Sequence, residues 1–327
     1  MRLCKIVQVG FGSLGKEIFV ALQNRKNFKL VSVIDIDKNK IGKDAGILAV
    51  NKRSGIKVVS HISTVKSKPD VAIHTTISSI NDAFDQISEL LKHRINVISS
   101  CEQLVYPYGS NTSMAKRLDI LAKKHKVSII GVGINPGFMM DSLVLMLTSL
   151  CSKIDCIRVE RVVDILNRRE TLQKKMCLGF TLEQFEKIKT KNNVGHVGLQ
   201  ESARMICDKL NVRMTTFAIT IKPVITKHVF QSSSITLEPG QVAGMEHTLV
   251  VKKLKSKFLE MKLNMFAGAR EFDLVKIEGI PTICVSTNGI NGDQATVALL
   301  LNYIPIILGA EPGLHTVNDL HIPSASL

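Results

Sequence analysis

A glycine-rich turn near the start of the chain constrains the fold more than any other feature. The sequence GFGSLG, residues 10–15, follows a short β-rich run, KIVQVG, and opens a helical pattern, KEIFVALQNR. Asp35 comes 20 residues after Gly15, at the end of the next apolar run. In this context the glycines let the turn close and let a pyrophosphate approach the backbone, while the helix N-terminus stabilises its charge. The alternative is a tight turn without a ligand.

The turn therefore predicts a bound dinucleotide. The contacts expected from the turn itself are Gly10, Gly12, Ser13, Leu14 and Gly15. Asp35 is expected to accept hydrogen bonds from the adenine-side ribose, which favours NAD. Lys38, Lys40 and Lys43 lie near enough in sequence to tolerate the 2′-phosphate of NADP. The sequence leaves both NAD and NADP open as cofactors.

Strands and helices alternate along the first 138 residues. Apolar, β-branched runs predict strands at 5–10, 29–37, 56–62, 70–76, 96–100 and 127–138. Helical patterns occur at 16–25, 83–94 and 114–126. This alternation predicts an α/β, Rossmann-type fold with a doubly wound parallel sheet.

The pattern changes after about residue 140. Strands are predicted at 155–165, 216–226 and 246–254, and helices at 181–190 and 198–210. In KFLEMKLNMFAG, apolar and polar residues alternate from Leu259 to Met265, as in a half-buried strand of an antiparallel or mixed sheet. The apolar segment 292–308 is expected to return to the first domain. We therefore expect a Rossmann domain at 1–138, completed by 292–327, and an α+β domain with a mixed open sheet at 139–291.

Composition narrows the classes of protein. The formal charge of +15 comes from 43 basic and 28 acidic residues, but the lysines are spread along the chain and no nucleic-acid-binding motif occurs. A basic field of this kind helps to attract anionic cofactors or substrates. The seven cysteines are odd in number and contain no Cys-x-x-Cys pair, which predicts free thiols and no metal site. No run approaches the roughly 20 apolar residues of a membrane span, so a cytoplasmic protein is expected.

Polar residues follow three of the predicted parallel strands, at the edge where ligands bind in such sheets. Thr75 and Thr76 end the fourth strand, Glu102 ends the fifth, and Asn135 lies at the end of the sixth. Because a glutamate is rarely buried without a partner, we expect Glu102 to lie in a cleft at this edge. Asn135 is expected to hold the nicotinamide amide or the substrate. Turn formation is the alternative for Thr75, Thr76 and Asn135.

Six stretches, in order and over almost the whole chain, carry a family resemblance. They are SSCEQLVYP, GVGINPGFMMD, RRETLQKKMCLGFT, GHVGLQES, NGINGDQATVALLLNYIP and AEPGLHTVNDL. Together they resemble the 2,4-diaminopentanoate dehydrogenases and native amine dehydrogenases, which are distantly similar to dihydrodipicolinate reductase. The resemblance implies a two-domain NAD(P)-dependent oxidoreductase, usually a homodimer, that deaminates a primary amine oxidatively to a ketone or runs in reverse as a reductive amination. In clostridial ornithine breakdown the family's substrate is 2,4-diaminopentanoate and its product is 2-amino-4-oxopentanoate.

The resemblance places the family's catalytic glutamate on Glu102 and a pocket position on His196. Hydride leaves the carbon that bears the amine, and water then attacks the iminium, which requires a general base. A partly desolvated carboxylate with a raised pKa suits these proton transfers. A plain loop role is the alternative for His196.

Other residues carry weaker predictions. Arg168 and Arg169 are expected to bind the carboxylate of an amino-acid substrate, because Arg binds carboxylates in a bidentate manner; a solvated basic face is the alternative. Asp293 and Thr296 are expected to start the helix that returns to the cofactor domain, with a cofactor contact as the alternative. Gln103 stands where relatives often have a second acid, which leaves the charge of the pocket open.

Three rival interpretations remain. Dihydrodipicolinate reductase carries a paired-histidine motif and a Lys-x-Asp-Ala-Pro-Ser-Gly-Thr stretch, and this sequence has neither. The meso-diaminopimelate dehydrogenase type fits the outline but not the CEQL and QKKMCLG stretches. A protein that only senses a dinucleotide is a rival from another class, and it would need no glutamate in the cleft. The substitution Glu102→Gln separates this sensor from an enzyme.

Overall fold

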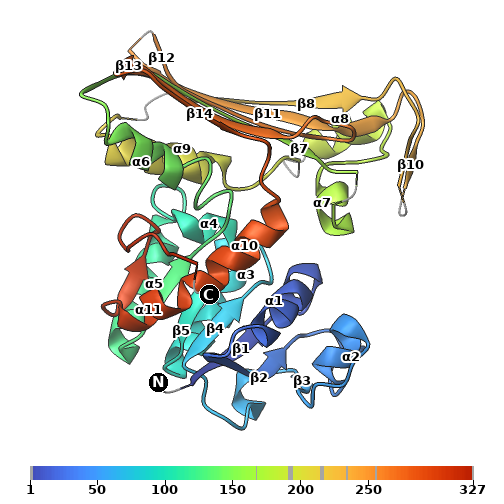
Figure 1. Ribbon diagram of the computed structural model, residues 1–327, viewed down its shortest axis with the longest axis vertical. Coiled ribbons are helices and arrows are strands. Elements are labelled where there is room, and N and C mark those ends of the chain that lie inside the picture. Colours follow the sequence, from blue (N-terminus) through green and yellow to red (C-terminus); the bar gives the residue numbers. More distant parts are fainter. Residues whose placement is uncertain are drawn as a thin grey trace. The chain divides into compact units, whose positions relative to one another are not determined.

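The computed structural model describes residues 3–166, 168–190, 194–213, 217–232, 235–254 and 256–325. The chain divides into two compact units (Figure 1). The first contains Met1–Gly137 and Asn291–Leu327, and the second contains Phe138–Ile290. These limits differ by one residue at each junction from those expected from the sequence.

The first unit is built on a parallel sheet of seven strands, in the order β15-β6-β5-β4-β1-β2-β3. The strands are β1 (Cys4–Val9), β2 (Phe28–Ile34), β3 (Val58–Val59), β4 (Val71–His74), β5 (Asn96–Ser99), β6 (Ser128–Gly131) and β15 (Gly313–His315). Every pairing within it is parallel. The predicted Rossmann-type sheet is therefore confirmed.

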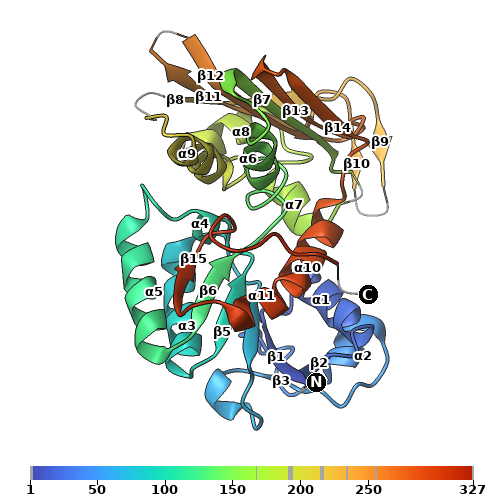
Figure 2. The ribbon, with the colours of Figure 1, turned by 60° about the vertical axis from the view of Figure 1, so that its left-hand side comes forward.

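Helices cover both faces of this sheet (Figure 2). Helices α3 (Ile80–Lys92) and α5 (Thr112–His125) pack together on one face, and α1 (Ser13–Gln23), α10 (Gly292–Asn302) and α11 (Ile304–Gly309) pack on the other. Short helices α2 (Ala45–Val50), α4 (Glu102–Val105) and the 3₁₀ turn η1 (Ile62–Thr64) follow strand ends or loops. The core beneath α3 and α5 is continuous because Val7, Ala72, Val97 and Ile129 project from four adjacent strands.

The segment Gly292–Gly309 is long and apolar enough to cross a membrane by length and composition alone. In the structure it is two helices, α10 and α11, with a break at Tyr303 just before Pro305. Their buried residues Val297, Leu300 and Ile307 belong to the core of the first unit. The segment thus returns to the first unit, as its apolar character predicts.

The second unit is an α+β structure whose six-stranded sheet has the order β14-β13-β7-β12-β11-β8. Its strands are β7 (Lys153–Asp164), β8 (Phe217–Ile225), β11 (Val242–Lys253), β12 (Ser256–Phe266), β13 (Phe272–Ile280) and β14 (Ile283–Thr287), and a separate hairpin contains β9 (Phe230–Gln231) and β10 (Thr236–Leu237). Strands β7 and β12 are parallel and their neighbours antiparallel, which confirms the predicted mixed sheet. The expected strand at 216–226 begins at residue 216, which lies outside the described residues.

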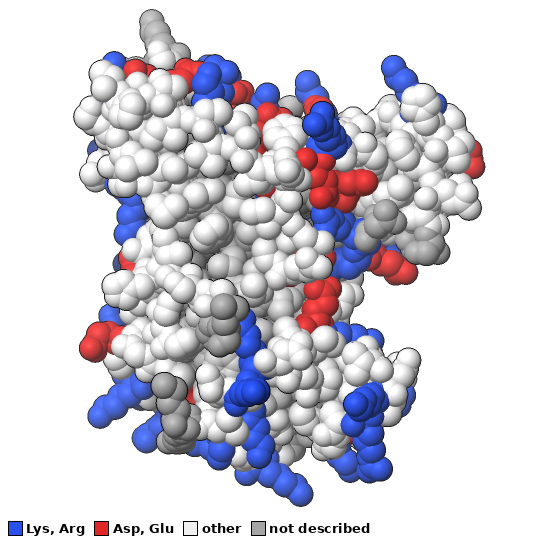
Figure 3. Space-filling model, viewed as in Figure 1, with Lys and Arg blue, Asp and Glu red and all other residues white. Residues whose placement is uncertain are grey.

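Helices of the second unit lie against one face of its sheet (Figure 1). Helix α9 (Leu199–Lys209) contacts β11 and β12, and α6 (Ser142–Thr148) packs on α9. The remaining helices are α7 (Glu170–Lys175) and α8 (Leu182–Lys189), the latter started by a capping box between Thr181 and Gln184. Lys and Arg side chains occur over both units on the face drawn in Figure 3, as their spread along the sequence predicts.

Several predicted boundaries are wrong. Strand β2 ends at Ile34, so Asp35 follows the strand instead of lying within it. The strand expected at 56–62 shrinks to Val58–Val59, and η1 takes its last residue. Glu102 does not end a strand: β5 stops at Ser99, and Glu102 is the first residue of α4. In each case the polar residues after a short buried run form a turn or cap, which ends the strand early.

Candidate functional site

The glycine turn follows β1 and opens α1, as predicted. A Cβ on Gly10, which has φ +88°, would lie 2.5 Å from the Thr75 carbonyl oxygen, and a Cβ on Gly15 would collide with the Gly10 carbonyl. A Cβ on Gly12 would meet nothing within 4 Å. The outer glycines thus permit close packing inside the protein, while Gly12 leaves open space on the ligand side. This division fits the backbone approach of a pyrophosphate.

The first turn of α1 offers backbone donors to that space. Gly12 is the N-cap and no side chain caps the helix, while Gly12 and Ser13 are exposed. Leu14 is half-buried and Gly15 is buried. A helix N-terminus with uncapped N–H groups stabilises anions, so the turn fits a dinucleotide diphosphate.

Asp35 is buried directly behind the turn. Its carboxylate accepts hydrogen bonds from the Phe11 N–H at 2.8 Å, the Asp37 N–H at 2.9 Å and the Lys40 ammonium at 3.0 Å. Burial raises the pKa of Asp35, but these hydrogen bonds and the Lys40 charge outweigh it and hold the pKa below its usual value. Asp35 is therefore an ionised brace for the glycine turn as well as a candidate ribose contact.

Thr75 and Thr76 follow β4 and play different parts. The Thr75 hydroxyl accepts a hydrogen bond from the Gln8 side chain at 2.7 Å and lies behind Gly10. Thr76 is exposed, and its hydroxyl contacts His74 Nε2 and Gln86 Oε1, both at 2.9 Å. Thr75 thus supports the turn from inside, whereas Thr76 faces the solvent at the carboxyl edge of the sheet.

Glu102 is half-buried at the start of α4, on the same edge. Two bonds fix the segment before and after it: Cys101 N–H donates to Ser99 Oγ at 3.1 Å, and Gln103 N–H donates to the Ser78 carbonyl at 3.2 Å. The Gln103 bond joins the loops after β4 and β5 just after Glu102, and the Cys101 thiol, which donates to the same Ser78 carbonyl at 3.2 Å, joins them just before it. These bonds hold the Glu102 carboxylate at the ends of the strands, where it is half-buried and lies outside the hydrophobic core.

Asn135 lies in the loop after β6 and is 7% exposed. Neither its amide oxygen nor its amide nitrogen has a hydrogen-bond partner in the described part of the chain. A Cβ on Gly131 would lie 2.5 Å from the Leu104 carbonyl carbon, so the absence of a side chain there lets α4 pack against the end of β6. The loops that carry Glu102 and Asn135 thus lie side by side. A buried amide without a partner indicates a ligand that supplies both a donor and an acceptor.

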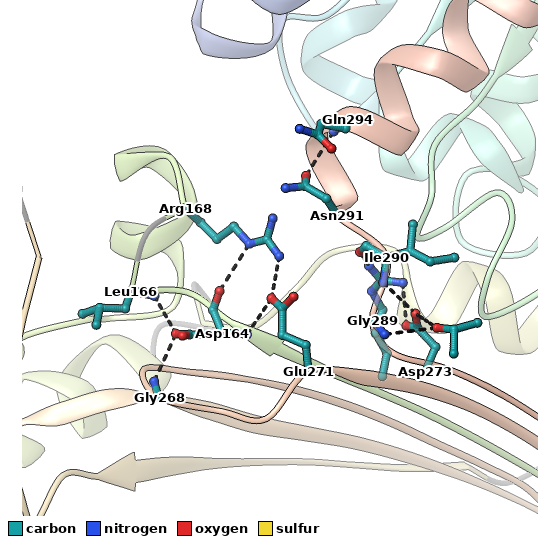
Figure 4. A network of polar contacts seen from close by, with 12 residues as sticks. Asp164, Leu166, Arg168, Gly268, Glu271, Asp273, Gly289, Ile290, Asn291 and Gln294 are labelled. Atoms are coloured by element: carbon teal, nitrogen blue, oxygen red, sulfur yellow. Dashed lines mark hydrogen bonds and ion pairs between the residues drawn. The ribbon is translucent and has the colours of Figure 1, made fainter.

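The other predicted site residues belong to the second unit. His196 is half-buried between Gly195, with φ +106°, and Gly198, the N-cap of α9. The Arg168 guanidinium is 2.5 Å from Glu271 and donates to the Asp164 carbonyl at 3.2 Å (Figure 4). Arg169 is the half-buried N-cap residue of α7. Since Glu271 already pairs with Arg168, any carboxylate ligand of Arg168 would compete with it.

A row of polar residues that the sequence analysis missed crosses the sheet of the second unit. Strand pairing aligns His247 with Leu263, Leu263 with Arg161, and Arg161 with Asp273, so these side chains share one face. Arg161 is 2% exposed and donates to Asp273 at 2.7 Å and to the Ile290 carbonyl at 2.5 Å. Figure 4 shows Asp273 beside Gly289 and Ile290.

His247 is the exception in that row. It is 6% exposed, and neither ring nitrogen has a hydrogen-bond partner among the described residues. Burial lowers its pKa to about 4, so the ring is neutral near pH 7 and offers one donor and one acceptor. A Cβ on Gly195, the neighbour of His196, would lie 3.4 Å from the ring. The sequence did contain a signal for this row. In β7 and β11, Arg161 and His247 occupy positions of the alternating pattern that are otherwise apolar.

Thr296 and Asp293 lie in α10. Thr296 Oγ1 accepts a hydrogen bond from the Ile134 N–H at 3.3 Å, which ties the helix to the loop that contains Asn135. Asn291, and not Asp293, caps the helix by accepting from the Gln294 N–H at 3.2 Å. Among the described residues, no group of three or more His, Cys, Asp or Glu side chains could hold a metal ion.

Comparisons with known proteins identify the family of the chain. Residues 138–327 match the model of the 2,4-diaminopentanoate dehydrogenase C-terminal domain, and residues 4–101 match the dihydrodipicolinate reductase N-terminus. A 2,4-diaminopentanoate dehydrogenase of Acetoanaerobium sticklandii is 29% identical, over 99% of this chain and 95% of that protein. An amine dehydrogenase of Streptomyces virginiae is 25% identical over 47% of this chain and 44% of that protein.

A solved structure shares the whole fold. The amine dehydrogenase from Mycobacterium smegmatis superposes with a TM-score of 0.89 at 20% identity, covering 99% of this chain and 97% of that one. The match to the reductase family model is confined to residues 4–101, whereas the diaminopentanoate dehydrogenase model covers more than half of the chain. The chain therefore belongs to the 2,4-diaminopentanoate dehydrogenase family and is an oxidoreductase of the amine dehydrogenase type that uses NAD or NADP.

Proposed function

We propose that the protein oxidises the amine-bearing carbon of a small amino acid, with 2,4-diaminopentanoate as substrate and 2-amino-4-oxopentanoate and ammonia as products, or runs the reverse reductive amination. The named relative from Acetoanaerobium sticklandii supports this substrate, since the identity extends over 99% of the chain. The side chains described above in each unit also support the reaction.

The observation that carries the substrate class is the buried His247, which has no hydrogen-bond partner among the described residues and lies in the row that includes Arg161. A buried polar group without a partner costs about 1–3 kcal/mol, and a bound ligand offsets that cost. The Arg161 guanidinium has five N–H donors and gives two hydrogen bonds in the described structure, to Asp273 and Ile290. A guanidinium with a neutral imidazole on the same face suits a carboxylate, the group that distinguishes an amino acid from a simple amine.

Glu102 is assigned to the proton transfers. NAD⁺ or NADP⁺ held at the glycine turn would supply the hydride acceptor for the substrate carbon. Glu102 takes a proton from the substrate ammonium, which makes the neutral amine that hydride loss requires. Once Glu102 has passed this proton to solvent, its carboxylate stabilises the iminium charge and removes a proton from the attacking water. Returning that proton to the nitrogen lets the carbinolamine release ammonia. Its half-buried position excludes some of the water that would otherwise screen these charges.

Residues of the first unit are assigned to the cofactor. Gly10, Gly12 and Gly15 shape the turn, Ser13 and Leu14 begin α1, and Asp35 lies behind the turn. We assign Asn135 to the nicotinamide carboxamide, because its buried amide offers the complementary donor and acceptor. His196 is assigned to the substrate side on the family resemblance, and Arg168 and Arg169 are assigned to it on the affinity of arginine for a carboxylate.

The test is an absorbance assay for reduced nicotinamide with 2,4-diaminopentanoate and either cofactor at alkaline pH. We expect Glu102→Gln to lower kcat by about 10²–10⁴-fold without weakening cofactor binding. Asp85→Asn, an exposed acid on α3, is the matched control. Activity retained in Glu102→Gln would refute its role. Turnover of simple amines but not of 2,4-diaminopentanoate would refute the substrate and leave the reaction class standing.

We also propose that the enzyme is a cytoplasmic homodimer. The family resemblance supports the dimer, and the seven free cysteines are in keeping with a reducing compartment. Light scattering of the purified protein tests the oligomeric state, and a mass near the 36.0 kDa of one chain would refute it.

A further inference from the structure

The loop after β2 carries a lysine folded back over the buried acid behind the glycine turn. Asp37 starts a tight turn: its carbonyl accepts the Lys40 N–H at 2.9 Å and the Ile41 N–H at 3.2 Å. This turn brings Lys40 Nζ to 3.0 Å from Asp35 and 3.6 Å from Asp37. The Lys40 side chain is 25% exposed, so it contacts the acid on one side and solvent on the other.

Asp35 has little capacity left for a ribose. An ionised carboxylate has about four acceptor sites, and three of those on Asp35 are taken by Phe11, Asp37 and Lys40. Its charge is also partly neutralised by Lys40. A selective NAD site needs an acid that both accepts from the 2′-hydroxyl and repels a 2′-phosphate. Asp35 still offers the first property, but the ion pair weakens the second.

The adenosine half of the cofactor belongs at this loop. In doubly wound folds the residue at the end of the second strand contacts the adenine-side ribose. Ile36, between the two acids, is 86% exposed and offers an apolar surface that suits the face of an adenine ring. Lys38 and Lys43 are exposed nearby and add positive field.

We infer that Lys40 determines cofactor choice: its ammonium binds the 2′-phosphate of NADP, so the enzyme accepts NADP as well as NAD. A phosphate monoester carries about −1.5 to −2 charges at neutral pH and takes charge-assisted hydrogen bonds from an ammonium. The Lys40 ammonium has three N–H donors and needs one for Asp35, which leaves two for the phosphate. With NAD, Lys40 stays on Asp35, and the remaining acceptor site of Asp35 takes the 2′-hydroxyl.

The test separates the 2′-phosphate from the rest of the cofactor. Calorimetric titration with 2′,5′-ADP and with ADP measures binding of the adenosine half without any turnover. In the unmodified protein we expect 2′,5′-ADP to bind at least as tightly as ADP. Lys40→Met, which keeps the aliphatic stem, is expected to weaken 2′,5′-ADP by tenfold or more and to leave ADP within twofold. Lys40→Arg should keep most of the 2′,5′-ADP affinity.

Lys29→Met is the matched control, because Lys29 is exposed near the other end of β2. Six residues of strand at about 3.3 Å each separate it from Asp35. The substitution Lys29→Met removes the same charge as Lys40→Met, and it should change the affinity for neither 2′,5′-ADP nor ADP. Equal weakening of both nucleotides by Lys40→Met would show that Lys40 only holds the loop, and would overturn the inference. No change with either nucleotide, or an unmodified protein that binds ADP better, would overturn it too.

Discussion

Two buried histidines, one in each unit, differ in their hydrogen bonding, and the difference distinguishes a structural residue from a candidate ligand contact. His74, at the end of β4, is fully buried, and His247, in β11, is 6% exposed. Burial lowers the pKa of each to about 4, so both rings are neutral near pH 7. His74 contacts Ser99 at 2.8 Å and Gln86 at 3.0 Å, whereas His247 has no hydrogen-bond partner in the described part of the chain.

The partners of His74 also define its tautomer. Gln86 Oε1 can only accept, so Nε2 carries the proton and Nδ1 accepts from the Ser99 hydroxyl. Ser99 in turn accepts the Cys101 N–H, one residue before Glu102. The partnered imidazole of His74 thus holds the segment that carries the proposed base, while that of His247 marks the place where we propose that a ligand supplies the partner.

The largest effect is expected at Arg161, which lies in the same row as His247 and, unlike His247, has hydrogen-bond partners. Arg161→Met leaves Asp273 buried at 3% exposure without its cation. The free energy of unfolding should fall by about 3–5 kcal/mol, measured by urea unfolding. The double variant Arg161→Met, Asp273→Leu should recover part of this loss. A single variant as stable as the parent would mean that the charge on Asp273 is solvated.

Acid should destabilise both histidine sites. Each folded pKa of about 4 lies below the ordinary 6.5, so between pH 6.5 and 4 the unfolded chain binds more protons. Stability should therefore fall as pH falls through this window, by about 1.4 kcal/mol per pH unit for each histidine. Urea unfolding at several pH values should show a shallower slope in either His→Leu variant. Identical slopes in all three proteins would contradict the two lowered pKa values.

His74→Leu should destabilise the first unit by about 1–3 kcal/mol, because Ser99 and Gln86 each lose a partner. The expected change in the assay is a lower kcat with little change in KM, since the Glu102 segment loosens. His93→Leu, at the exposed end of α3, is the control. A His74→Leu variant as stable as the parent would show that the hydrogen bonds of His74 do not stabilise the first unit, so that the two histidines would not differ in role.

His247→Leu should change stability least, by less than about 1 kcal/mol in either direction, since no hydrogen bond in the described structure is lost. The KM for 2,4-diaminopentanoate should rise by about tenfold, the equivalent of one lost hydrogen bond to a charged group. The KM of a simple amine should not change. His228→Leu, an exposed histidine of the same unit, serves as control. A marked loss of stability with unchanged KM would make His247 a scaffold residue like His74.

Much of the first unit could be predicted from the sequence because its signals are local. The glycine turn, the following helix and Asp35 are contiguous or spaced by one strand and one helix, and apolar runs locate the central strands. Parallel order then places Thr76, Glu102 and Asn135 at one edge. The predicted ends of the strands were less accurate. Whether the polar residues after a strand extend it, form a turn or cap a helix depends on contacts with residues far away in sequence.

The sequence alone determined the fold class, the dinucleotide turn and the edge that carries Glu102, because periodicity and turn chemistry are properties of short segments. Only the tertiary structure decided that His247 and Arg161 share a face, since they are 86 residues apart and meet through the register of β11, β12 and β7. It also decided that Lys40 folds over Asp35 and that the Asn135 amide is buried without a partner in the described residues. Register, burial and the satisfaction of polar groups depend on the whole chain, so no local pattern encodes them.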